Sequence, residues 1–148
     1  MHKDVKYFIS EFYNLIKSVD INSDYKLSEY IEAYNNNGDL IDIDNGLYIY
    51  GSCDRGSCEI IFQSANISDC MYFLIRALIH SYAFNYELNH RKVNQDARIM
   101  GFGMMLYYIN KFNKKAWVER LYSELIPIIR LDELDENLIL KIANFGKI

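Results

Sequence analysis

The chain has 148 residues, of which 51% are hydrophobic and 15% aromatic, and its formal net charge is −4. This length fits a single domain over residues 1–148 that buries a core without a metal ion, and the composition excludes an intrinsically disordered chain. The acidic balance argues against nucleic acid as a partner, because phosphates are bound by lysine and arginine. It suits a protein partner with a basic surface, although many proteins are acidic for solubility alone.

The sequence predicts a cytoplasmic protein that does not enter membranes. No apolar signal region follows Met1, and the longest apolar stretch, residues 71–88, carries Arg76, His80, Asn85 and Glu87. A membrane span does not normally tolerate four such residues. The three cysteines are an odd number, which we interpret as reduced thiols in the cytosol. They are Cys53, Cys58 and Cys70.

Two helices are predicted before residue 39. Apolar residues recur at spacings of three and four between Val5 and Val19, which predicts a helix over residues 3–19. A shorter helix should end at Gly38, because glycine is the preferred residue after a helix C-terminus. Its marker residues are Leu27, Tyr30, Ile31 and Tyr34.

Residues 39–64 alternate apolar and polar side chains, which predicts three antiparallel strands near 39–44, 46–53 and 57–64. A two-residue turn at Arg55-Gly56 would place Cys53 opposite Cys58. One face would then carry Leu47, Ile49, Ile60 and Phe62, and the other Tyr48, Tyr50, Glu59 and Gln63.

The turn of the first hairpin decides which face receives Ile41 and Ile43. A two-residue Asn45-Gly46 turn puts both isoleucines on the tyrosine face. A three-residue loop with a left-handed Gly46 puts them with Leu47 instead. We favour the longer loop, because a slip of one residue moves every apolar side chain to the other face.

The second half of the chain predicts helices. Ser68 is the expected N-cap of an apolar helix to about residue 89, which we expect at the centre of the fold. A further helix is expected over residues 95–112. Asn113 should cap the next helix, and the apolar segment 138–145 should form the last one. Pro127 should kink or end the helix that contains it. The prediction is therefore an α+β fold, in which a small three-stranded antiparallel meander packs on a body of four to six helices.

Two glycines could indicate a phosphate-binding loop, and three side chains could indicate a metal centre, but both groups also have structural interpretations. Gly101 and Gly103 lack the third glycine of a phosphate loop, so a close helix–helix contact is the better interpretation. His80, Glu87 and His90 lie along one helix face, and the last two repeat the spacing of di-iron bundles. A metal centre needs a second such motif, which the chain lacks, so we predict no metal, no cofactor and no enzymatic activity.

The run from Asn45 to about Leu125 resembles the bacterial immunity protein 63 family. The resemblance rests on the aromatic strand segment 46–52 and on a polar block that follows the long apolar helix. Departures occur at Asn94 and Ile99, the basic stretch after the tryptophan is reduced to Glu119-Arg120, and residues 132–148 look like an extension. The matching residues of the block are Phe84, Tyr86, Glu87, Leu88, Arg91, Gln95, Asp96 and Arg98, followed by Trp117.

The resemblance implies a role in a polymorphic toxin system, in which the chain binds and occludes a cognate protein toxin. A generic interaction module and a small metalloenzyme built on His80, Glu87 and His90 are the alternatives. Glu87, Arg91, Asp96 and Arg98 are expected to form one polar cluster, either scaffold or interface. The tyrosine-bearing sheet face is either the toxin-binding surface or is covered by the first helix. The toxin-binding candidates are Tyr48, Tyr50, Asp54, Arg55 and Glu59.

Overall fold

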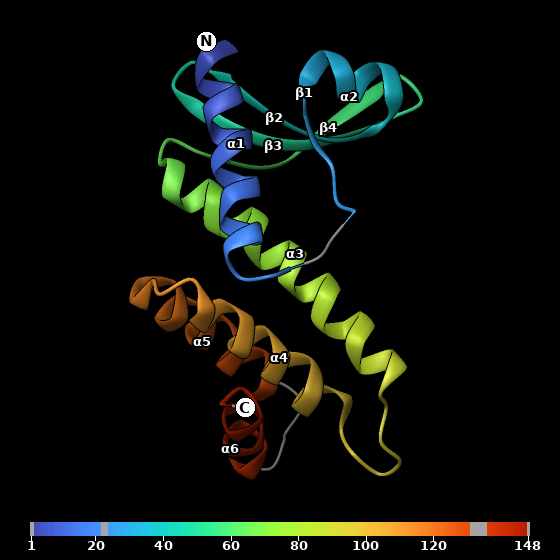
Figure 1. Ribbon diagram of the computed structural model, residues 1–148, viewed down its shortest axis with the longest axis vertical. Helices are drawn as coiled ribbons and strands as arrows, with labels where there is room; N and C mark the ends of the chain where they lie inside the picture. Colours follow the sequence, from blue (N-terminus) through green and yellow to red (C-terminus); the bar gives the residue numbers. More distant parts are fainter. Residues whose placement is uncertain (1, 22–23, 131–135, 148) are drawn as a thin grey trace. The chain divides into compact units, whose positions relative to one another are not determined.

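The computed structural model describes residues 2–21, 24–130 and 136–147, and these form two compact units (Figure 1). The first unit is Met1–Ile75, and the second is Arg76–Ile148. The described elements confirm the α+β class, whereas a single domain over residues 1–148 stays a prediction. No helix in the described part of the chain is long and apolar enough to span a membrane.

The first unit holds a four-stranded sheet with two helices. The helix α1 begins one residue before the predicted start, and its apolar face buries Val5, Phe8, Phe12 and Ile16. The elements in chain order are α1 (His2–Ser18), β1 (Leu27–Glu29), α2 (Tyr30–Asn36), β2 (Gly38–Asp44), β3 (Leu47–Asp54), β4 (Ser57–Ser64) and the start of α3 (Ile67–Asn89).

The sheet is mixed rather than purely antiparallel, because β1 adds a parallel strand beside β2. The strand order is β1-β2-β3-β4, and the three predicted strands are confirmed as the antiparallel part. The prediction placed Leu27 in the second helix, and this is wrong. Leu27 pairs with Asp39 in the parallel ladder, and α2 begins at Tyr30. A three-residue strand is too short to show a period of two.

The first hairpin has the two-residue turn, so the predicted three-residue loop is wrong. Asp44 pairs with Leu47, and Asn45 and Gly46 have φ angles of 50° and 78°. Positive φ at both central residues is the requirement of a type I′ turn, for which Asn-Gly is a preferred sequence. Ile41 therefore pairs with Tyr50, and the isoleucines lie on the tyrosine face.

The second hairpin confirms the Arg55-Gly56 turn but differs in its face assignment. Both turn residues have positive φ, and Cys53 pairs with Cys58. Further along, Gly51 pairs with Ile60 while Tyr50 pairs with Phe62, so Ile61 is the extra residue of a β-bulge. A bulge reverses the alternation beyond it, and this moves Phe62 to the tyrosine face.

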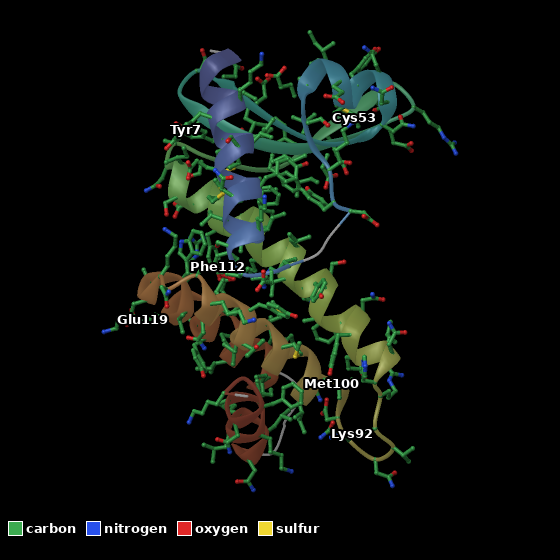
Figure 2. The ribbon with its side chains drawn as sticks, viewed as in Figure 1. Tyr7, Cys53, Lys92, Met100, Phe112 and Glu119 are labelled. Atoms are coloured by element: carbon green, nitrogen blue, oxygen red, sulfur yellow. A yellow bond between two sulfur atoms is a disulfide. The ribbon has the colours of Figure 1, made fainter. Side chains whose placement is uncertain are left out.

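Cys53 and Cys58 are joined by a disulfide, so the prediction of reduced thiols is wrong for this pair (Figure 2). The turn register brings their Cα atoms to 4.0 Å. Cys53 is buried with Leu40 and Ala33, and the last is the buried residue of α2. The helix α2 therefore packs on the sheet face opposite Tyr48. Cys70 is a free, buried cysteine, and burial raises the pKa of its thiol to about 12.

The helix α3 contributes buried side chains to both units. Its first turn is capped by Asn66 rather than the predicted Ser68, because Asn66 Oδ1 accepts hydrogen bonds from the backbone N–H groups of Ser68 and Asp69. Asparagine competes well with serine at this position. The second unit continues with α4 (Ala97–Lys111), α5 (Lys115–Arg130) and α6 (Glu136–Phe145).

Two glycines of α4 allow close contacts between helices in the second unit. A Cβ atom at Gly101 would overlap the Phe84 ring, and one at Gly103 would lie 2.6 Å from Phe145 Cδ1. This confirms the interpretation of both glycines as helix–helix contacts. Asn113 has a positive φ of 56° and precedes the cap position of α5 by one residue, so the capping prediction is wrong. Pro127 lies inside α5, which continues to Arg130.

Candidate functional site

Tyr50 is part of the core of the first unit. Its side chain is 7% exposed, and its hydroxyl donates a hydrogen bond to Asp39 Oδ2 over 2.9 Å. Tyr25 donates a second hydrogen bond to the same oxygen over 2.6 Å. Burial raises the pKa of Tyr50 to about 12 and also raises that of Tyr25. Because a buried tyrosine hydroxyl needs a partner, these bonds explain how the ring is accommodated in the core.

Tyr48 is half-buried against α1. Its ring centroid lies 6.1 Å from that of Phe8, which is fully buried. The ring of Tyr50 meets Phe73 of α3 at 5.9 Å. The sheet face that carries these tyrosines therefore packs against helices, which is the second of the two alternatives considered for it. Tyr50 is thus buried and Tyr48 half-buried, while their role in toxin binding stays a prediction.

The other three candidates lie at or beside the tip of the second hairpin and are exposed. They are Asp54, Arg55 and Glu59. The backbone N–H of Arg55 donates a hydrogen bond to Asn37 Oδ1 over 2.9 Å, which ties the turn to the end of α2. The disulfide lies directly below the turn. The tip is therefore held in place from two sides while its charged side chains reach solvent.

An exposed aromatic surface adjoins this tip and was not predicted. Tyr30 and Tyr34 of α2 are 45% and 44% exposed, and their rings stack with centroids 6.1 Å apart. A Cβ atom at Gly56 would lie 3.7 Å from the Tyr34 hydroxyl, so the helix and the turn are neighbours. The sequence did not signal this exposure, because Tyr30, Ile31 and Tyr34 have the spacing of a buried helix face.

The four charged residues of the predicted polar cluster form two ion pairs. Arg91 contacts Glu87 through two hydrogen bonds of 2.9 and 3.1 Å, and these bonds lower the pKa of the Glu87 carboxyl. Arg98 contacts Asp96 in the same way, over 2.9 and 2.7 Å, and lowers its pKa. Asp96 is also the N-cap of α4, as it accepts a hydrogen bond from the Arg98 backbone N–H.

The two ion pairs differ in burial, and Gln95 and Trp117 are two further residues on which the family resemblance rests. The Glu87 side chain is 4% exposed, whereas that of Arg91 is 58% exposed. Gln95 is half-buried. Trp117 is buried against Phe112, with Lys114 Nζ 5.0 Å from its ring centre. The block therefore has a structural role in the second unit, while a role in partner binding stays a prediction.

The residues of the metal hypothesis each have other neighbours. The His80 ring stacks on Phe84 at 4.6 Å, and burial together with Arg76 lowers the pKa of this histidine. The His90 ring stacks on Tyr86 at 4.0 Å. Within residues 2–21, 24–130 and 136–147, no group of three histidine, cysteine or acidic side chains is placed to hold a metal ion.

Comparison with known proteins gives one match. No curated protein and no solved structure matches this chain. The family model described as immunity protein 63 matches residues 44–126, which is more than half of the chain. The matched segment begins at the last residue of β2 and includes β3, β4, α3, α4 and most of α5. The chain therefore belongs to the immunity protein 63 family.

Proposed function

We propose that this chain is an immunity protein that protects the cell that makes it by binding a cognate protein toxin. The family match over residues 44–126 carries this proposal. Binding one toxin molecule and blocking its active surface needs no turnover, so the proposed activity is stoichiometric and not enzymatic. The proposed place of action is the cytoplasm, where the partner is the toxin domain rather than a nucleic acid or a membrane.

The hairpin tip is the proposed first contact with the toxin. Asp54, Arg55 and Glu59 are exposed at or beside a turn that the bond to Asn37 holds against the end of α2. A preorganised surface loses less conformational entropy on binding than a flexible one. Charged residues at an interface rim act mainly on the association rate and on its salt dependence. In this arrangement Tyr48 and Tyr50 support the fold behind the contact.

The proposal is tested with the product of the neighbouring gene as the candidate toxin. Co-expression of the chain should protect bacteria that express this product, and the two purified proteins should form a 1:1 complex. Asp54→Asn together with Glu59→Gln should lower the association rate, while Asp20→Asn, an exposed charge after α1, should not. If the wild-type chain neither protects cells nor binds this product, the proposed function is wrong.

A further inference from the structure

A small pocket opens at the start of α2 in the first unit. Its deep wall is apolar, because Val5 is 4% exposed and Ile41 is fully buried. Tyr30 and Ile31 are exposed and line the same pocket. The remaining lining residues are two carboxylates, Glu29 and Asp42.

The two carboxylates differ in their hydrogen-bond partners. Asp42 Oδ1 accepts a hydrogen bond from the Ile43 backbone N–H over 2.8 Å. The Oε1 atom of Glu29 is buried and has no hydrogen-bond partner among the described residues. A buried carboxylate oxygen without a donor destabilises a protein, so this oxygen is an acceptor that a donor entering the pocket would satisfy.

The lining of this pocket matches one kind of side chain. Lysine and arginine combine an aliphatic stem with a cationic head, and the stem prefers apolar walls. Here Val5 and Ile41 would contact the stem, and Glu29 and Asp42 would bind the head. The exposed face of the Tyr30 ring can add a cation–π contact. An apolar or ionised acidic side chain would leave the Glu29 oxygen without a donor, and a neutral polar one would leave the two carboxylates without a cation.

The net negative charge of the surrounding part of the chain also favours a basic partner. Residues 1–75 contain twelve acidic and five basic residues, whereas residues 76–148 contain eight acidic and eleven basic residues. The first half therefore carries a formal charge of −7 and the second half +3. A surface in the acidic half attracts a basic protein and increases its rate of encounter.

We propose that α2, with this pocket at its start and the hairpin tip at its end, is the surface on which a basic protein toxin docks, and that a lysine or arginine of the toxin enters the pocket. This inference rests on the proposed function. It adds Glu29, Tyr30 and Tyr34 to the contact, all of which precede the matched residues 44–126. The proposed contact then combines residues that precede the family segment with the hairpin tip, which lies inside it.

The test measures the affinity of full-length variants for the separately purified product of the neighbouring gene. Glu29→Gln and Tyr30→Ala should each weaken binding by about thirtyfold, as is typical for an interface hot spot. Two controls carry the same substitutions elsewhere. Tyr7→Ala removes a 59% exposed tyrosine from α1, and Glu119→Gln removes an exposed carboxylate from α5, and neither should change the affinity.

Thermal unfolding separates loss of contact from loss of fold. Glu29→Gln removes a buried charge that has no donor, so the melting temperature should stay the same or rise while the affinity falls. A Glu29→Lys variant places a like charge against the incoming cation and should abolish binding. If Glu29→Gln and Tyr30→Ala bind as tightly as wild type, the pocket is not the docking site.

The remaining outcomes separate this inference from the proposed function. Wild-type protection of cells with unchanged binding by the variants overturns only the docking site. A wild-type chain that binds nothing overturns both. A change in the oligomeric state of the isolated chain on Tyr30→Ala would assign this surface to a second copy of the chain and would also overturn the proposal.

Discussion

The two compact units differ both in charge and in the way that their elements are held together. The first unit is acidic, and its sheet is fixed by short turns, a bulge and a disulfide. The second unit is basic over its sequence, and its helices approach one another at Gly101 and Gly103. Exposed aromatic and acidic side chains therefore coincide on the first unit, at α2 and the hairpin tip.

This difference indicates how the family segment is used. Residues 44–126 extend over parts of both units and contain the hairpin tip, whereas α2 precedes them. Within the segment, side chains such as Leu106, Trp117 and Leu121 are buried and form part of the core. The helix α2 buries only Ala33 among its described residues, so its other side chains reach solvent and can contact a partner.

The largest expected effect is in the core of the first unit. Phe8→Ala should lower the free energy of unfolding by about 3–5 kcal/mol, because it removes a fully buried ring that packs against Tyr48. The neighbouring variant Tyr7→Ala is the control, since this ring is exposed and should change stability by less than about 0.5 kcal/mol. Urea denaturation measures both. Equal stability of the two variants would contradict the packing of α1 on the tyrosine face.

The packing of that face is also where the sequence was least informative. Periodicity predicted α1 and the three antiparallel strands closely, because both patterns are local. It did not predict which helix covers which face, because that depends on contacts between residues far apart in the chain. The first hairpin was assigned by keeping apolar residues together, although Asn45-Gly46 itself favoured the shorter turn.

Two other features had no periodic signal. The strand β1 has only three residues, and the bulge at Ile61 adds one residue without changing the composition of β4. Gly51 marks the bulge in retrospect, because a Cβ atom there would overlap the Glu59 carbonyl oxygen. The predicted pairing of Cys53 with Cys58 already places the two thiols close enough for a disulfide. The odd number of cysteines led us to interpret them as reduced instead. For the candidate site, the sequence pointed to the exposed hairpin tip but missed the surface of α2.

The second unit should respond to added volume. Gly101→Ala places a methyl group on the Phe84 ring, and overpacking of this kind costs about 1–3 kcal/mol. Alanine is favoured over glycine in a helix by about 1 kcal/mol, so the net loss of stability should be about 2 kcal/mol at most. Phe84→Leu in the same chain should recover part of that loss. If Gly101→Ala is more stable than wild type in thermal unfolding, the close approach of these helices is wrong.

The smallest effect is expected at the start of α4, where Asp96 caps the helix and pairs with Arg98. Asp96→Ala should cost about 1 kcal/mol at pH 7, which is typical for an N-cap. Because Arg98 lowers the pKa of Asp96 in the folded chain, the charge contributes stability that is fully present above the ordinary pKa of 3.8. This contribution is lost as the pH falls through the lowered pKa.

The difference in unfolding free energy between wild type and Asp96→Ala should therefore be constant from pH 7 to about pH 5 and should shrink below about pH 4. Asp96→Asn keeps a hydrogen-bond acceptor for the Arg98 backbone N–H but removes the charge, so it should lose less than Asp96→Ala. A difference that grows on acidification would show that the carboxylate is destabilising in the folded chain, and the role of Asp96 as a charged cap would then be wrong.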